Sequence, residues 1–166
     1  MKKTETCILG CYEIQFDRHE DDRGFFQELY SLNKYDMQPG EQISCSCSKK
    51  NVIRGLHISL YYKLCSCVSG RLFDVAVDLR KDSPTYLKWT GVWLSADSCV
   101  QFLVPPGCGH GFYSAEDNTL LVYLQGGCYK KANDLEVRWN DPTIGIQWPE
   151  CDGYIISEKD QNAPCL

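Results

Sequence analysis

The stretch Asn51-Val-Ile-Arg-Gly-Leu-His57 places an imidazole and a guanidinium beside a glycine in an apolar run. An imidazole can exchange protons near neutral pH, and a guanidinium binds anionic oxygens. In a regular strand Arg54 and His57, three residues apart, point to opposite faces. A bulge at Gly55 would turn both toward one pocket. We therefore expect a strand that presents a base and an anion-binding group together, although a lone histidine in such a run is more often structural.

The runs that could position this pair are short, and turn residues separate them. They contain the alternating or apolar patterns typical of strands, at residues 7–16, 25–28, 42–49, 52–58, 64–69, 72–79, 87–94, 100–104 and 120–124. Residues 17–22 form a charge run expected to be a solvated loop, and residues 139–149 are too rich in Pro, Gly and Trp for regular structure. The pattern predicts an antiparallel sandwich or barrel around which the C-terminal third wraps.

The strand expected at 72–78 has two different faces. Asp74, Ala76 and Asp78 alternate with Phe73, Val75 and Val77. The carboxylate-bearing face would line the lumen of a barrel that holds a site, or would face solvent.

Composition limits the classes of function. A chain of 166 residues fits one domain, taken as 1–166, and its net charge of -5 argues against a nucleic-acid partner. Neither an apolar signal region nor a run long enough to span a membrane is present, so we expect a cytoplasmic protein.

Eleven cysteines are an odd number, and without an export signal they are expected to be free thiols rather than disulfides. Cys45-Ser-Cys47 and Cys65-Ser-Cys67 each put two thiols on one strand face, so a zinc site between two strands is conceivable.

Six motifs in order carry a family resemblance. They are Asp22-Arg-Gly-x-Phe-x-Glu28, Arg54-Gly-Leu-His57, Gly70-x-x-x-Asp-Val-Ala-Val-Asp-Leu-Arg80, Pro105-x-Gly-x-x-His-Gly-Phe112, Trp139-Asn-Asp-Pro and Ser157-x-Lys-Asp160. From about residue 22 to residue 166 the chain resembles the dTDP-4-dehydrorhamnose 3,5-epimerase family, nucleotide-sugar epimerases of the cupin class.

The resemblance implies an all-β fold, a cupin double-stranded β-helix (jelly roll) with short helical or irregular C-terminal segments. It also implies a homodimer and an isomerase that uses no cofactor and no metal. The reaction would invert C3, C5 or both in a nucleotide-linked 4-keto sugar, for surface polysaccharide synthesis such as that of capsule or lipopolysaccharide.

By the same resemblance His57 is the base, Asp160 holds its other ring nitrogen, and Tyr123 is the proton donor on the opposite face of the sugar. Lys63 would stabilise the enolate, with Asp74 and His110 as neighbours. The positions that match substrate contacts in the family are Arg23, Glu28, Gln42, Arg54, His110, Tyr129, Asp134 and Lys159.

The chain departs from the family at a few positions. Asp134 stands where glutamate is usual and Ser44 where asparagine is usual. The segment between His57 and Lys63 is short, and together with the run from Arg80 to Lys88 it also resembles relatives that act on GDP-linked 4-keto heptoses. The nucleotide and the sugar therefore stay open between dTDP-4-keto-6-deoxyhexose and GDP-4-keto-heptose.

Three alternative functions stay open. A 3,4-ketoisomerase on the same scaffold would move the carbonyl, and a binding module would hold a sugar nucleotide without turnover. A metal cupin would use His110, which lies in a segment like the second metal-binding motif of cupins. That reading lacks support from the first motif, where His57 stands alone.

Overall fold

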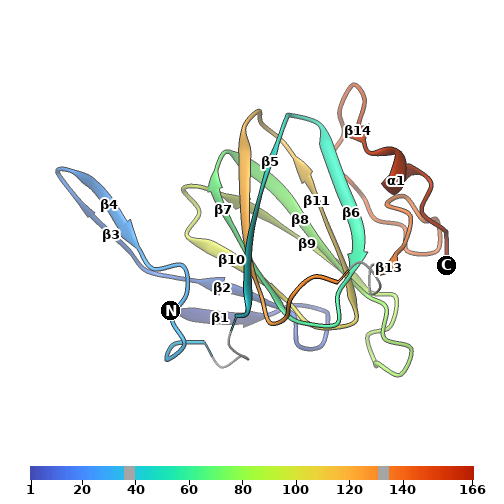
Figure 1. Ribbon diagram of the computed structural model, residues 1–166, viewed down its shortest axis with the longest axis horizontal. Helices are drawn as coiled ribbons and strands as arrows, with labels where there is room; N and C mark the ends of the chain where they lie inside the picture. Colours follow the sequence, from blue (N-terminus) through green and yellow to red (C-terminus); the bar gives the residue numbers. More distant parts are fainter. Residues whose placement is uncertain (36–39, 131–134) are drawn as a thin grey trace.

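The computed structural model describes residues 1–35, 40–130 and 135–166, and nearly all of its regular structure is strand (Figure 1). The elements are β1 (Lys2–Glu5), β2 (Tyr12–Gln15), β3 (Arg18–Asp21), β4 (Gly24–Gln27), β5 (Gln42–Ser48), β6 (Val52–Ile58), β7 (Lys63–Ser69), β8 (Arg71–Asp78), β9 (Trp89–Ser95), β10 (Val100–Val104), β11 (Cys108–Ser114), β12 (Thr119–Gln125), β13 (Leu135–Glu136), β14 (Ile155–Ile156) and α1 (Glu158–Gln161). No helix of the described residues is long and apolar enough to cross a membrane.

Two antiparallel sheets face each other. The first has the order β1-β2-β10-β7-β12-β5 and the second the order β13-β6-β11-β8-β9. From β5 to β8 the chain changes sheet at every strand, and it does so again from β9 to β12. Strands that alternate between two facing sheets form a jelly roll, so the predicted all-β double-stranded β-helix is confirmed.

The main core lies between the sheets. Cys65, Phe102 and Leu121 of the first sheet pack with Leu72 and Leu94 of the second, and all five are fully buried. The inward-facing residues of each strand supply this core because side chains alternate along a strand.

The cysteines are free thiols, as expected. The conceivable zinc site between the two Cys-Ser-Cys pairs does not form. Strand β12 lies between β5 and β7, and Cys45 and Cys47 are exposed whereas Cys65 and Cys67 are buried in the core.

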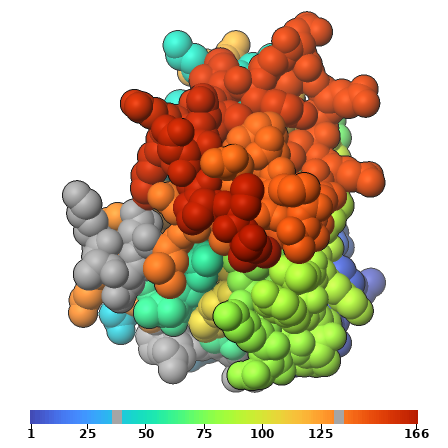
Figure 2. All heavy atoms as spheres, turned by 90° about the vertical axis from the view of Figure 1, so that its right-hand side faces the viewer, coloured from blue at the N-terminus to red at the C-terminus, as the bar shows by residue number. Residues whose placement is uncertain are grey.

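The C-terminal third covers the outer face of the second sheet, as predicted. Val75, Val77 and Tyr113 on that face pack against Ile144 and Trp148. Figure 2 shows the C-terminal residues spread over this side of the molecule. Strand β14 then pairs in parallel with β6, which places α1 beside that strand.

Some local predictions differ from the structure. The prediction of a solvated loop for the charge run was wrong, because these residues form strand β3, which pairs with β4 in a hairpin that projects from the body (Figure 1). Strand β11 was not predicted, although it is buried at every residue. Its glycines lower the strand propensity, and the neighbouring strands β6 and β8 supply the pairing that forms it.

Candidate active site

The predicted bulge is present in β6. His110 of β11 pairs with His57, and Phe112 pairs with Arg54. Between these two pairs β6 has one more residue than β11, which is a bulge. Gly55 has a φ of 127°, and a Cβ there would lie 2.6 Å from the Cα of Gly111. Only glycine fits this close approach of two strands. As a result Arg54 and His57 both line one cavity.

The C-terminal helix completes a histidine–carboxylate pair. The Nε2 atom of His57 lies 3.0 Å from Oδ1 of Asp160, and the backbone N–H of Gly55 donates to Oδ2 at 3.0 Å. Burial alone would raise the pKa of Asp160, but the hydrogen bonds from His57 and from Gly55 hold it below its ordinary value. The carboxylate therefore stays ionised and fixes the His57 ring with Nδ1 left for proton transfer.

The helix itself is built to present that carboxylate. Ser157 is the N-cap of α1, and its Oγ accepts a hydrogen bond from the N–H of Asp160 at 3.1 Å. In a capping box the residue three after the cap returns its own side chain to the cap. Here the Asp160 side chain turns instead to β6 and His57.

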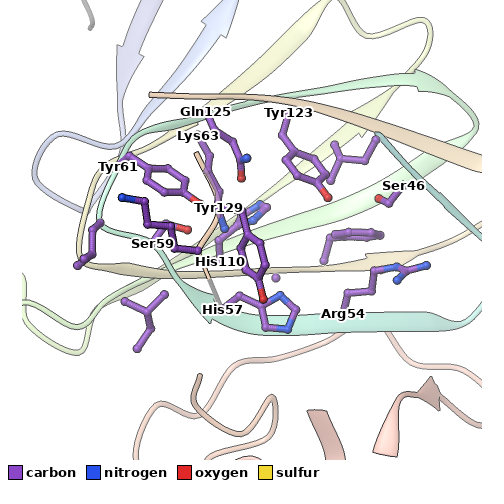
Figure 3. A pocket seen from close by; sticks show the side chains of 16 residues that line it. Ser46, Arg54, His57, Ser59, Tyr61, Lys63, His110, Tyr123, Gln125 and Tyr129 are labelled. Atoms are coloured by element: carbon purple, nitrogen blue, oxygen red, sulfur yellow. The ribbon is translucent and has the colours of Figure 1, made fainter. Parts of the chain in front are cut away.

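The cavity lies between the two sheets and has a volume of about 220 Å³. Arg54, His57 and His110 approach it from the second sheet, and Lys63 and Tyr123 from the first (Figure 3). The remaining lining residues are Ser46, Ile58, Ser59, Leu60, Tyr61, Gly111, Phe112, Leu121, Gln125, Tyr129 and Lys130.

One corner of the cavity holds buried polar groups. Nε2 of His110 and Oδ1 of Asp74 form a hydrogen bond at 2.7 Å, and the Sγ atom of Cys65 lies 3.5 Å from the same nitrogen. Asp74 is fully buried, so its face of β8 points into the barrel and not to solvent. Lys63 lines the same cavity and is only 8% exposed. A lysine at such a place can stabilise negative charge on a ligand.

A phenol occupies the opposite wall from His57. Tyr123 is half-buried on β12, and burial raises its pKa above the ordinary value. The phenol is therefore protonated at neutral pH. A base on one wall and an acid on the other can remove a proton from one side of a ligand and return one to its other side.

Two further predicted residues stand at the cavity. The guanidinium of Arg54 donates to Ser48 Oγ at 3.1 Å and to the carbonyl of Cys47 at 3.2 Å, while its side chain stays exposed. Tyr129 is 53% exposed at the rim, and its backbone N–H donates to Oε1 of Gln42 at 2.9 Å. Gln42 does not line the cavity and instead anchors this aromatic residue.

The other predicted contacts lie elsewhere in the chain. Arg23 pairs with Asp21 at the tip of the projecting hairpin, and Glu28 pairs with Lys34. Lys159 contacts Glu136 at 3.2 Å outside the cavity. Asp134 lies outside the described residues.

Sequence reasoning missed Gln125, Ser46, Ser59 and Tyr61 as cavity residues. Gln125 could have been found from its spacing of two from Tyr123, which puts both on one strand face. Ser46 lies in the alternating polar face of β5, whereas Ser59 and Tyr61 belong to a connection whose path no periodicity predicts.

Within residues 1–35, 40–130 and 135–166, two clusters carry atoms of the type that bind metals, each with its ligand atoms within 4.8 Å: Cys65, Asp74 and His110, and His57, Glu136 and Asp160. Each contains a histidine–carboxylate hydrogen bond that explains the proximity of its members without an ion.

Comparison with known proteins agrees with this geometry. A sequence model of the dTDP-4-dehydrorhamnose 3,5-epimerase family matches residues 5–166. The chain is 39% identical over 155 residues to the dTDP-4-dehydrorhamnose 3,5-epimerase of Salmonella typhimurium, which covers 88% of this chain and 85% of that protein.

Solved structures extend the likeness to three dimensions. The dTDP-4-dehydrorhamnose 3,5-epimerase of Elizabethkingia anophelis superposes with a TM-score of 0.93 at 38% identity, covering 99% of this chain and 96% of that chain. The dTDP-6-deoxy-D-glucose-3,5-epimerase of Legionella pneumophila, solved in complex with dTDP-4-keto-L-rhamnose, gives 0.95 at 33% identity, covering 99% and 92%.

The cupin-type fold, the nucleotide-sugar epimerase function and the isomerase class predicted from sequence are confirmed by these relatives. With a family match over residues 5–166, a histidine and a tyrosine on opposite walls of one cavity, and the fold in common, the chain belongs to the dTDP-4-dehydrorhamnose 3,5-epimerase family.

Proposed function

We propose that this epimerase acts on a dTDP-linked 4-keto-6-deoxyhexose and inverts C3 and C5. The observation that carries the proposal is the placement of His57, held by Asp160, across one cavity from Tyr123, with Lys63 in the same cavity. The Legionella relative, whose structure contains dTDP-4-keto-L-rhamnose, supports this class of substrate.

The reaction begins at a carbon next to the ketone. Nδ1 of His57 takes the proton from that carbon, and the electron pair of the C–H bond moves to the C4 oxygen to form an enolate. Lys63 stabilises the negative oxygen. Tyr123 then gives its proton to the opposite face of the carbon, which restores the ketone with inverted configuration. Each positioned acid or base of this kind contributes about 10² to 10⁴ in rate.

The nucleotide part is held outside the reacting centre. The exposed guanidinium of Arg54 has the geometry to bind pyrophosphate oxygens. Tyr129 offers an exposed ring at the rim on which the base can stack, and Gln42 fixes its backbone. Lys159 and Asp134 complete the proposed set of polar contacts.

A second copy of the chain is part of the proposal. Phe25 and Phe26 on the projecting hairpin are 56% and 69% exposed, and Ile43 on β5 is 72% exposed. A contiguous patch of exposed apolar side chains marks an interaction surface, and we propose that these three belong to one. In a homodimer the partner would cover them, and Arg23 and Glu28 of the hairpin would reach the partner's substrate rather than their own.

We propose that the product is an activated sugar, made in the cytoplasm and used for surface polysaccharide synthesis. GDP-linked 4-keto heptose is the alternative substrate, favoured by the short connection from β6 to β7 that brings Tyr61 to the cavity wall. The proposed chemistry needs neither metal nor cofactor, because the ketone itself acidifies the carbon.

Proton NMR in heavy water tests the proposal. The protein is mixed with dTDP- and GDP-linked 4-keto sugars, and the C3 and C5 signals are followed. We expect both signals to disappear with a dTDP sugar and new product signals to appear. His57→Asn should abolish this exchange. Movement of the carbonyl to C3 would identify a ketoisomerase, and binding without exchange by the wild type would identify a binding module.

A further inference from the structure

Gln125 lines the cavity, but the proposed reaction gives this residue no role. It lies on β12 two residues after Tyr123, so both side chains leave the same face of the strand. Its Cα is the register partner of Lys63 on β7, and directly opposite residues of antiparallel strands project side by side. Figure 3 shows Gln125 and Lys63 next to each other, with both side chains pointing into the cavity.

The amide of Gln125 is buried, and its N–H group lacks an acceptor among the described residues. The residue is 4% exposed, and its Nε2 donates no hydrogen bond to any residue in the described ranges. Its register partner on the other side, Gln42, uses its amide for Ser44 and for the N–H of Tyr129. Leaving a buried donor unpaired is destabilising. A donor aimed into a ligand cavity recovers that cost when a ligand supplies the acceptor.

The position of the amide identifies the acceptor. The Gln125 side chain lies beside that of Lys63, so the amide and the ammonium can both reach one ligand oxygen. In the proposed reaction the oxygen that meets Lys63 is the C4 ketone oxygen, which gains negative charge as the enolate forms. A fixed, desolvated N–H donor at that oxygen stabilises the transition state more than the ground state.

We propose that Gln125 is a catalytic residue that donates a hydrogen bond from Nε2 to the C4 oxygen beside Lys63. The two residues together form the oxyanion site of the enzyme. This inference rests on the proposed function. It has a particular signature, because deprotonation at C3 and deprotonation at C5 both place charge on the same C4 oxygen. A loss of the donor therefore slows both exchanges by a similar factor.

The test compares two changes at this position with one at the surface. Gln125→Met keeps the length of the side chain but removes the donor, and Gln125→Glu replaces the donor by a negative oxygen. Gln147→Met is the matched control, because Gln147 is exposed in the C-terminal segment. The rates of proton exchange at C3 and at C5 are measured by NMR in heavy water at saturating and at limiting substrate.

For Gln125→Met we expect a fall in kcat of about 10²-fold, the usual effect of losing one oxyanion donor. The factor should be similar at C3 and C5, with little change in KM. Gln125→Glu should fall further because its charge opposes the enolate, and Gln147→Met should exchange like wild type. Thermal unfolding checks folding, and Gln125→Met should be at least as stable as wild type because it removes an unpaired buried donor.

Three results would overturn the inference: undiminished exchange in Gln125→Met, a rise in KM with kcat unchanged, or a loss confined to one carbon. If the Met variant did not fold, Gln125→Asn would serve, since it keeps the amide but withdraws it from the oxygen, and the same three results apply. Absence of exchange in the wild type would instead refute the proposed function, so the two failures are distinguishable.

Discussion

Asp160→Asn removes the negative charge of the His57–Asp160 pair but nearly keeps the shape of the side chain. The substituted amide has one carbonyl oxygen where the carboxylate uses two, one for His57 Nε2 and one for the Gly55 N–H, each at 3.0 Å. The amide nitrogen is a donor, so it can pair with His57 Nε2 only if the ring carries its proton on Nδ1, the atom that acts as base. Either one of the two hydrogen bonds or the competent tautomer is therefore lost, and the charge that supports a protonated His57 is lost as well.

The size of the effect follows from the type of bond. A hydrogen bond to a charged group is worth about 1.5–3 kcal/mol, which corresponds to about 10- to 150-fold in rate. We expect kcat to fall by at least the lower of these factors, through a misoriented ring and a less stable imidazolium. If Gly55 is left unpaired, stability falls by about 1–3 kcal/mol. At about 2–4 °C per kcal/mol this lowers the Tm by about 2–12 °C.

The assay is the exchange of the sugar protons with deuterium, followed by NMR, with thermal unfolding on the same samples. Glu158→Gln is the matched control, because Glu158 is an exposed carboxylate two residues away in α1. It should leave the rate and the Tm unchanged. A folded Asp160→Asn protein with exchange within threefold of wild type would refute the role assigned to the carboxylate.

Three further changes probe the scaffold and the acid. Gly55→Ala should abolish exchange and impair folding, since the added Cβ meets the backbone of Gly111 at 2.6 Å; a soluble, active variant by circular dichroism and NMR would contradict this. Burial raises the pKa of Tyr123 above its ordinary value, so the phenol stays protonated beyond the usual tyrosine range. The alkaline loss of kcat that disappears in Tyr123→Phe should therefore lie at a higher pH than an exposed tyrosine would give. Asp78→Asn should lower stability by about 3 kcal/mol without slowing exchange, because this fully buried carboxylate accepts from Arg80 in the turn after β8. The pKa of Asp78 is depressed, so its contribution to the free energy of unfolding is present above the unfolded pKa near 3.8 and is lost as pH falls from there toward the lower folded pKa. Urea unfolding at several pH values would measure this loss.

Most strands could be predicted from local pattern alone. The runs 52–58 and 100–104 coincide with β6 and β10, because alternation and punctuation by Gly and Pro are properties of neighbouring residues. Strand β11 could not be predicted in that way. Its glycines carry no strand preference, and its pairing depends on β6 and β8, which lie far away along the chain.

The chemical groups of the site can be read from the sequence. The types and order of the four residues proposed to act are part of the covalent structure: His57, Lys63, Tyr123 and Asp160. The motifs around them are sufficient for the family resemblance. A glycine between Arg54 and His57 also predicted the bulge that turns both toward the cavity, because the reason is local backbone freedom.

Which of these groups face the same space depends on the folded chain. It brought Asp160 to His57 across 103 residues through the pairing of β14 with β6, and it placed Gln125 beside Lys63 through the register of β12 with β7. It also placed Arg23 at the turn of the β3–β4 hairpin and Glu28 just after that hairpin, and neither lines the cavity. Such juxtapositions depend on strand register and sheet order, which are set by the packing of the whole core and not by any one stretch of residues.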